Sequence, residues 1–304
     1  MYTLQTKQLS HRFGNGQMAV DHINLQVPDQ SIYCFLGPNG AGKTTTLRLL
    51  LGLIKPTAGT INFFPNHPSP NRVALMQRIG ACIEVPSLFH HLTAVQNVAI
   101  YTKAYRTPKS RMDEVLHLLG LADAKNKKVS QFSIGMKQRL SIAIALLHQP
   151  ELVILDEPTN GLDPQGIAEI RSTIIELNKN EKITFLISSH LLSEVEKLAT
   201  HVGIIHKGQM KFQGTMTELY QASSKAAKLI LSTDNDEAAM QLIATHFDMQ
   251  PIASGALIYS SIDQSHSLKI NRMLHDHRIG VSQLQWQDND LETHFLRLIQ
   301  NPTI

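Results

Sequence analysis

A stretch near the amino terminus has the residue types and spacing of a phosphate-binding loop. It reads Gly37-Pro38-Asn39-Gly40-Ala41-Gly42-Lys43-Thr44-Thr45 and fits the pattern G-x-x-x-x-G-K-[ST]. The glycines allow a tight turn whose N–H groups point at a phosphate. Lys43 is expected to reach the β- and γ-phosphates, and the Thr44 hydroxyl to ligate Mg²⁺. A glycine-rich turn with a chance lysine is the alternative.

The sequence on either side supplies the strand and the helix that such a loop needs. Residues 31–36 are apolar and predict a short buried strand, and residues 44–54 carry leucines at 47, 50, 51 and 53, broadly the spacing of a helix with one apolar side. The positive end of that helix would add to the attraction for a phosphate. The context therefore favours nucleotide binding over a chance match, although the loop alone indicates only a superfamily.

The composition limits the class of protein. A chain of 304 residues can form two domains, and 42% hydrophobic with 17% charged residues is typical of a folded protein. A net charge of +3 is too small to indicate a nucleic-acid partner. Cys34 and Cys82 lie in predicted buried strands and are interpreted as reduced core residues of a cytosolic protein. We find no apolar run long enough to span a bilayer and no signal peptide at Met1.

Strand and helix patterns alternate along most of the chain. This alternation predicts a mostly parallel sheet that binds its ligand at the carboxyl ends of its strands. Two strands, 2–9 and 19–27, are predicted to flank a Gly14-Asn15-Gly16 turn. Further strands are expected at 60–64, 79–84, 152–155, 183–187 and 202–206, and helices at 71–78, 94–119 (broken near Thr107-Pro108), 135–148, 164–178 and 191–199.

Two carboxylates follow the apolar run at residues 152–155, which is expected to be a central strand buried on both faces. Asp156 should hold Mg²⁺ beside Thr44. Glu157 is then placed to polarise a water molecule for attack on the γ-phosphate. Two acids that only confer solubility are a weak alternative, because the strand before them is so apolar.

A second phosphate-binding position is predicted where Ser133 can cap the helix that follows it, since a capped helix start is an anion site. The surrounding stretch Gln131-Phe132-Ser133-Ile134-Gly135-Met136-Lys137-Gln138-Arg139 resembles the signature motif of the ABC-type ATPases, usually Leu-Ser-Gly-Gly-Gln. Phe132, Ile134 and Met136 depart from that motif. Ser133 and Gly135 keep the two positions that touch phosphate in the family.

Three more residues match positions of this family in the expected order. Asp163 resembles the D-loop aspartate, and it can also cap a helix with Pro164 at its first position. His190 resembles the switch histidine that senses the γ-phosphate. Phe13 stands where the family has an adenine-stacking aromatic residue, although it could simply pack at the edge of the hairpin.

The resemblance implies an α/β fold for residues 1–221. This is the ATPase cassette, with a mostly parallel sheet, an antiparallel β edge and an inserted helical subdomain at about 85–150. A cluster of small and polar residues at 222–225 predicts the domain boundary. Residues 222–304 predict strands at 227–232, 249–253, 256–262 and 280–286 and helices at 236–246, 265–277 and 291–300. Without the last helix, this β-α-β-β-α-β order is the ferredoxin-like pattern of a small α+β domain.

One departure points to a subgroup. Glu84 stands where the family usually has glutamine, and this feature resembles the exporter ATPases linked to bacitracin resistance and lantibiotic self-protection. The form of the signature and the size of the C-terminal extension are similar to that subgroup too. Glu84 could accept a hydrogen bond from the attacking water and ligate Mg²⁺, but it cannot donate as glutamine does. The alternative is that glutamate replaces glutamine at this position as a tolerated, isosteric change that says nothing about the transported substrate.

The resemblance implies half of a two-site ATPase. ATP and Mg²⁺ would lie between the phosphate-binding loop of one copy and Ser133 and Gly135 of a second copy in a head-to-tail dimer. A separate permease would dock near the Glu84 loop and residues 85–106, where the run 87–89 and Leu92 form either a contact surface or local core. The chain would lie peripherally at the cytoplasmic face of the membrane, attached only through that permease.

We therefore expect the ATPase subunit of an exporter for an antimicrobial peptide or a similar drug. An importer ATPase and a soluble regulatory or assembly ATPase without a permease are the alternatives.

Overall fold

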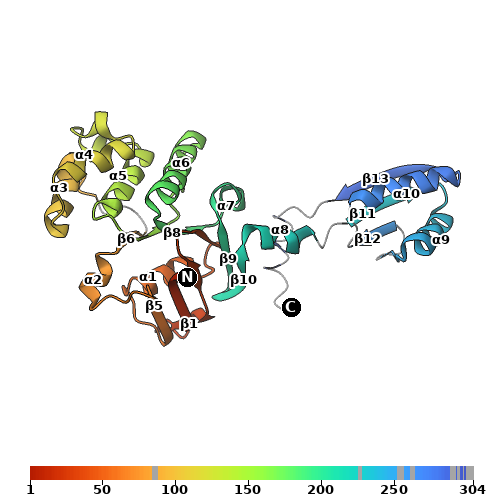
Figure 1. Cartoon of the computed structure of the whole chain (residues 1–304), viewed down its shortest axis with the longest axis horizontal. Helices are drawn as coiled ribbons and strands as arrows, with labels where there is room; N and C mark the ends of the chain where they lie inside the picture. Colours follow the sequence, from red (N-terminus) through yellow and green to blue (C-terminus); the bar gives the residue numbers. More distant parts are fainter. Residues whose placement is uncertain are drawn as a thin grey trace. The chain divides into compact units, whose positions relative to one another are not determined.

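The computed structural model describes residues 1–83, 88–224, 228–251, 257–260 and 264–287, together with residues 292, 295, 296 and 298. The chain divides into two compact units, Met1–Thr215 and Met216–Ile304, and Figure 1 labels most of their helices and strands. The boundary predicted between residues 221 and 222 falls inside helix α8 (Met216–Ser224). The two units divide before that helix, between Thr215 and Met216.

The first unit contains ten strands and seven α-helices among its described residues, with two short 3₁₀ helices. Its strands are β1 (Tyr2–Arg12), β2 (Met18–Ile23), β3 (Gln26–Pro28), β4 (Ile32–Leu36), β5 (Ala58–Phe63), β6 (Ile79–Cys82), β7 (Leu152–Asp156), β8 (Thr184–Ser189), β9 (His201–His206) and β10 (Gln209–Thr215). Its helices are α1 (Lys43–Leu50), α2 (Arg72–Met76), α3 (Ala94–Tyr105), α4 (Ser110–Leu118), η1 (Ala122–Ala124), η2 (Val129–Gln131), α5 (Ile134–Leu146), α6 (Pro164–Glu181) and α7 (Leu192–Leu198).

The central sheet of this unit has the strand order β10-β9-β4-β8-β7-β6. The five strands from β9 to β6 are parallel, and β10 runs antiparallel to β9. The expectation of a mostly parallel sheet is confirmed. Strand β10 was not predicted. The carboxyl ends of β4, β7 and β8 lie at one edge of this sheet, and the loops that follow them carry the predicted site residues.

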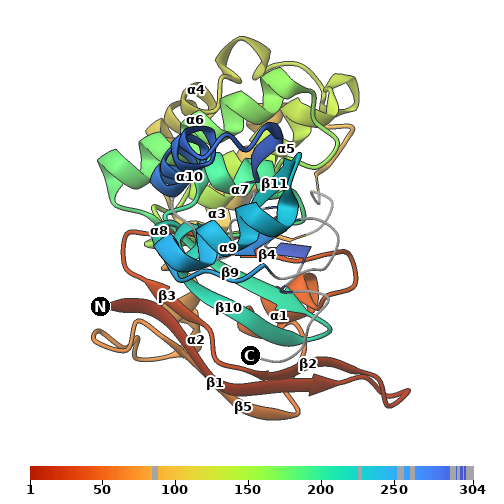
Figure 2. The same ribbon diagram turned by 90° about the vertical axis from the view of Figure 1, so that its right-hand side faces the viewer.

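The second sheet of the unit is antiparallel, as the predicted β edge requires. Strand β1 pairs with β2, β3 and β5, and Figure 2 shows β1 between β2 and β5. The strand predicted at 19–27 is divided into β2 and β3, which pair with different parts of β1. His22 marks the end of β2 with a φ of 52°, a conformation that interrupts regular strand geometry.

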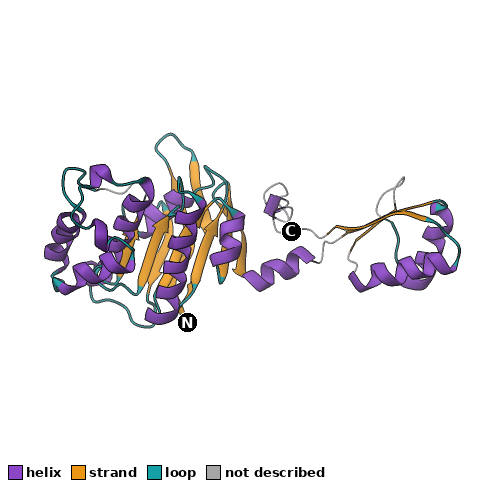
Figure 3. Cartoon of the chain, turned by 90° about the horizontal axis from the view of Figure 1, so that it is seen from above, coloured by secondary structure: helices purple, strands orange, loops and turns teal. Residues whose placement is uncertain are grey.

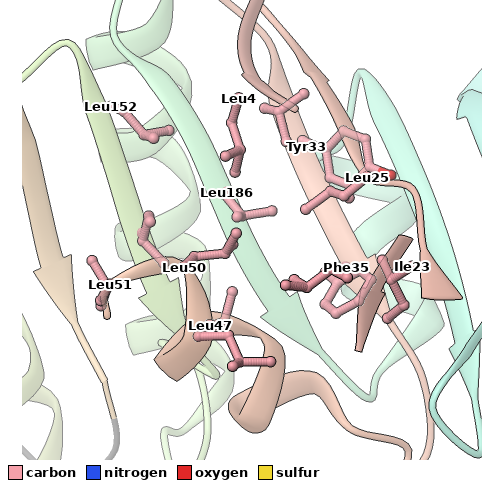
Figure 4. Close-up of a cluster of buried hydrophobic side chains, with 14 of the residues drawn as sticks. Leu4, Ile23, Leu25, Tyr33, Phe35, Leu47, Leu50, Leu51, Leu152 and Leu186 are labelled. Carbon is pink, nitrogen blue, oxygen red and sulfur yellow. The ribbon is translucent and has the colours of Figure 1, made fainter. Parts of the chain in front are cut away.

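The main core of the unit lies between the two sheets and around α1. Figure 4 shows Tyr33 and Phe35 of β4 packed against Leu47 of α1 and Leu4 of β1. These side chains are fully buried, and burial of each such residue contributes about 1.5–3 kcal/mol. The core therefore fixes β4 against α1, the two elements that the predicted phosphate-binding loop joins.

The helical insertion predicted at about 85–150 contains α3, α4 and α5, which contact one another. The predicted break near Thr107-Pro108 is confirmed, because α3 ends at Tyr105 and α4 begins at Ser110. Thr93 and Gln96 form a capping box at the start of α3.

The second unit begins with α8 and continues with β11 (Lys228–Thr233), α9 (Asp236–Phe247), β12 (Leu257–Ser260), α10 (Gln264–Asp276) and β13 (Val281–Gln287). Strand β11 lies between β12 and β13 and is antiparallel to both. Leu229 and Leu231 of β11 pack with Ile243 of α9 and Leu274 of α10 in a separate core. Figure 3 shows the strands and helices of this unit as two layers.

The strand order β12-β11-β13 is the order that the third, first and last strands of a β-α-β-β-α-β unit adopt. The predicted second strand, 249–253, is not observed at 249–251, and residues 252 and 253 lie outside the described part of the chain. Most of the predicted helix 291–300 also lies outside it. Among the described residues, no helix combines the length and the apolar character needed to cross a membrane.

Candidate active site

The loop predicted to bind phosphate joins the end of β4 to the start of α1. Gly42 precedes the first residue of α1 and has a φ of 107°, which a residue with a side chain rarely adopts. A Cβ atom on Gly42 would lie 2.5 Å from the carbonyl oxygen of Ala19, and one on Gly37 would lie 2.4 Å from that of Ile205. Close packing therefore requires glycine at both positions.

Lys43 is the first residue of α1, and only 5% of its side chain is exposed. Its Nζ atom donates hydrogen bonds to the carbonyl oxygens of Gly37 at 2.8 Å and Pro38 at 3.3 Å. The same atom lies 3.2 Å from Oε1 of Glu157. The ammonium group is thus held inside the curve of the loop, where it can neutralise the charge of a bound phosphate.

Asp156 is the buried last residue of β7 and connects the loop to the sheet. The Thr44 hydroxyl donates to Oδ2 of Asp156 at 2.9 Å. The Ser188 hydroxyl, from β8, donates to Oδ1 of the same carboxylate. Neighbouring hydroxyl and carboxylate oxygens form the donor set that Mg²⁺ prefers, so these residues fit the predicted ion.

Glu157 follows Asp156 and turns the chain away from the sheet with a φ of 47°. Its backbone N–H donates to Oγ of Ser188 at 2.9 Å. Its Oε2 atom lies 2.9 Å from Nδ1 of His190, and its Oε1 atom faces Lys43. The predicted base and the predicted switch histidine are therefore in direct contact.

A hollow of about 440 Å³ is lined by Lys43, Thr44 and Glu157, but not by Asp156 or His190. Phe13, in the turn between β1 and β2, lines the same hollow, although it lies 24 positions before Gly37 in the sequence. Its ring is partly exposed and lies edge-on to His11. The lining residues are Phe13, Gln17, Met18, Ala19, Asn39, Gly40, Gly42, Lys43, Thr44, Thr45, Glu157, Lys207 and Gly208.

Five residues of this lining were not predicted. They lie in or beside two hairpin turns: Gln17, Met18, Ala19, Lys207 and Gly208. Lys207-Gly208 could suggest a turn, but its position beside the predicted phosphate-binding loop depends on the tertiary structure. Burial, together with the charges of Lys207 and Lys211, lowers the pKa of His206. The positive charge of Lys207, which lines the hollow, favours an anionic ligand at this edge.

Three of the predicted signature residues, Ser133, Ile134 and Gly135, line a different hollow of about 420 Å³, and Met136 does not. Asp163, at the start of α6, lines the same hollow. Ser133 caps α5 by accepting a hydrogen bond from the N–H of Met136, and Asp163 caps α6 by accepting one from Gly166. Ile134 is 63% exposed at the mouth. The two hollows share no lining residue, so one chain does not bring the signature to the phosphate-binding loop.

Glu84 lies outside the described residues, as do residues 85–87, and its predicted roles stay predictions. Near that segment, Leu88 is buried whereas Phe89 is 43% exposed. Asn97 of α3 is fully buried, and its side chain bonds both the N–H and the carbonyl of Phe89. Leu88 is thus part of the local core, and Phe89 is held at the surface.

Comparisons with known proteins agree along the chain. A family model described as ABC transporter matches residues 20–160. The chain is 44% identical to the bacitracin transport ATP-binding protein of Bacillus licheniformis, over 99% of this chain and 98% of that protein. It is 42% identical to the lantibiotic transport ATP-binding protein of Streptococcus pyogenes, over 68% of this chain and 88% of that protein.

Solved structures show the same fold. The structure of cbiO1 from Clostridium perfringens, part of the ABC transporter complex cbiONQ, is similar with a TM-score of 0.65 and 28% sequence identity. The similarity covers 81% of this chain and 96% of that one.

Proposed function

Because the chain belongs to the ATP-binding proteins of ABC transporters, we propose that it powers an exporter for bacitracin or a similar antimicrobial peptide. As a member of that family it is an ATPase. The observation that carries the proposed substrate is the 44% identity to a bacitracin transport ATP-binding protein over 99% of this chain. That relationship includes the second unit, whereas the relationship to the lantibiotic transport protein covers 68% of the chain. A bacitracin-like peptide is therefore favoured over a lantibiotic.

The proposed mechanism of hydrolysis uses the contacts around Glu157. Lys43 and the N–H groups of the loop would bind the phosphates of ATP and offset their charge. Glu157 would accept a proton from the water that attacks the γ-phosphorus, and the bond to the β–γ bridging oxygen would break as the new P–O bond forms. His190, 2.9 Å from Glu157, would keep that carboxylate directed toward the attacking water.

Thr44 and Asp156 are the residues that would hold Mg²⁺, since their oxygen atoms are 2.9 Å apart. When bound, this ion would neutralise charge on the β- and γ-phosphate oxygens. Glu84 is proposed as a further ligand and as a second contact of the attacking water, on the basis of the sequence resemblance alone.

The separation of the two hollows supports a dimer. Ser133 and Gly135 present a capped helix start, a good anion site, at a distance from the loop that binds the phosphates. A head-to-tail pair of chains would bring each signature onto the ATP held by the other chain. Ile134 and Met136 would then lie in the interface, and Asp163 beside it.

Attachment to the membrane would require a separate permease, on whose cytoplasmic face the chain would lie. The cbiO1 relative is part of an ABC transporter complex, which supports such an assembly. Phe89, Ile100 and Tyr105 are partly exposed apolar residues of the helical insertion and would form part of the contact. An importer ATPase and a regulatory ATPase without a permease are the competing functions.

Resistance measurements test the proposed transport function. The chain would be expressed with the permease gene found next to its own in a sensitive bacterium, and growth measured with bacitracin and with a lantibiotic. We expect resistance to bacitracin with the natural chain and with Glu181→Gln, a matched change at the end of α6, but not with Glu157→Gln. Unchanged sensitivity with the natural chain, or a chain that never co-purifies with the permease, would contradict the proposal.

The role of Glu157 is tested separately with purified full-length chain. Glu157→Gln should bind ATP as the natural chain does and lower the rate of phosphate release by about 100-fold or more. Because ATP then stays bound, size-exclusion chromatography should show a dimer that persists with ATP. Undiminished turnover in this variant would remove Glu157 as the base.

A further inference from the structure

We propose that Ser188 is a positioning residue for ATP hydrolysis, because its single hydroxyl group holds both acidic residues of the site. The proposal rests on the roles proposed above for Asp156 and Glu157. It adds to the site a residue that lines neither hollow and that no recognised motif singles out.

The position of Ser188 follows from the register of the sheet. Strands β7 and β8 are parallel, and Asp156 is paired with Ser188 across them. Ser188 is completely buried. Its Oγ atom donates to Oδ1 of Asp156 and accepts the N–H of Glu157 at 2.9 Å. A hydroxyl group has one proton and two lone pairs, so these two bonds can exist together.

The bond to Asp156 orients the carboxylate toward the phosphate-binding loop. With Oδ1 held by Ser188, Oδ2 is the oxygen that faces Thr44. Rotation of the carboxylate about its Cβ–Cγ bond by about a quarter turn would break both contacts. Ser188 therefore fixes the plane of the carboxylate and keeps one of its oxygens beside the Thr44 hydroxyl, where the metal ligands are proposed to lie.

The bond to Glu157 supports a backbone conformation that residues other than glycine rarely adopt. Glu157 has a φ of 47°, and such a conformation persists only when the surroundings hold it. Ser188 accepts the N–H at this turn. The backbone conformation of Glu157 then directs its side chain between Lys43 and His190. Loss of the hydroxyl would leave a polar N–H without this partner and free the turn to move.

The neighbouring serine provides a matched control. The Ser189 hydroxyl accepts from the N–H of Leu191 at 3.0 Å and donates to its carbonyl at 3.4 Å. Both bonds stay within the loop that leads to α7. Ser188→Ala and Ser189→Ala therefore remove the same atom from adjacent residues, and only the first removes contacts with the two acids.

The test is steady-state phosphate release by the full-length chain, with ATP and Mg²⁺ varied in turn. For Ser188→Ala we expect kcat to fall roughly 10- to 100-fold and the Mg²⁺ concentration needed for half-maximal rate to rise, with the KM for ATP changed by less than about threefold. Ser188→Thr, which keeps the hydroxyl, should restore most of kcat. Ser189→Ala should behave like the natural chain. Thermal unfolding of each variant would identify any loss of folding.

Three results would overturn the proposal: a natural kcat in a folded Ser188→Ala variant, an equal loss of kcat in Ser189→Ala, or a change confined to the KM for ATP. Glu157→Gln is measured in parallel. If Glu157→Gln loses turnover while Ser188→Ala keeps it, the positioning role fails and the proposed mechanism stands. If Glu157→Gln keeps turnover, the proposed mechanism fails.

Discussion

Two glycines of the predicted phosphate-binding loop allow the cost of backbone strain to be measured separately from the cost of a steric clash. The measured quantity is the stability of the chain with alanine at one or the other position. Gly40 and Gly42 both have positive φ, 79° and 107°. A Cβ atom on Gly40 would have no neighbour within 4 Å, whereas one on Gly42 would lie 2.5 Å from the carbonyl oxygen of Ala19 and 3.4 Å from a side-chain carbon of Ile205. Ala19 belongs to β2, so relief of the clash would have to separate this strand from the loop.

The expected magnitudes follow from these contacts. Gly40→Ala should cost about 1–2 kcal/mol, the strain of a left-handed residue with a side chain. Gly42→Ala should cost that amount plus about 1–3 kcal/mol for overpacking. A domain of this size loses about 2–4 °C in melting temperature per kcal/mol, so Gly42→Ala should melt roughly 2–12 °C below Gly40→Ala.

Differential scanning calorimetry of the full-length variants measures this difference directly, in the absence and presence of ATP. The two variants share the substitution, the loop and the sign of φ, and they differ in the clash with β2. Equal melting temperatures for the two variants would refute the assignment of the clash to Gly42.

Three further predictions concern the site and the core. Lys43→Ala removes an amine held by two carbonyls and Glu157, and it should weaken ATP binding roughly 10- to 100-fold in a direct titration; unchanged affinity would count against the loop assignment. Thr44→Val should raise the Mg²⁺ requirement of phosphate release, whereas Thr46→Val, whose hydroxyl bonds only within α1 and its cap, should not. Burial raises the pKa of Cys34 from 9.0 to about 12 and that of Cys82 to about 11. Between pH 9 and 11 the unfolded chain therefore loses thiol protons that the folded chain retains. The free energy of unfolding should fall with rising pH by up to about 1.4 kcal/mol per unit for each thiol. Denaturant titrations should show a shallower fall when both residues are alanine, and identical slopes would contradict the assignment.

Elements with continuous apolar runs or clear stop signals were predictable from the sequence. Strands β4 and β7 consist of buried residues throughout, and the runs at 32–36 and 152–155 leave little choice of structure. Pro108 and Pro164 mark a helix break and a helix start for local reasons, since proline fixes φ and lacks an N–H.

Strand β10 was not predictable in the same way, because none of its residues is buried. Its place in the sheet depends on pairing with β9 through the two-residue turn at Lys207 and Gly208, both with positive φ. Asparagine and glycine are the usual residues in such a turn, so a lysine in its first position gives a weak signal. The division of residues 19–27 into β2 and β3 has a similar cause, since it depends on which parts of β1 are free to pair.

Within the site, residue types indicated the chemistry, and the pairings between them required the fold. The sequence suggested that Lys43, Asp156, Glu157 and His190 act together, but only the contacts show which carboxylate each partner takes. Ser188 and Ser189 illustrate the limit most clearly, because two adjacent serines at the end of an apolar strand have equivalent surroundings in the sequence. Side chains alternate between the faces of a strand, and the pairing of Asp156 with Ser188 decides which hydroxyl reaches the acids. A register shift of one residue between β7 and β8 would place either Ile187 or Ser189 opposite Asp156 and remove Ser188 from both acids. The positions of the acids in the site therefore depend on the packing that sets the register of the whole sheet.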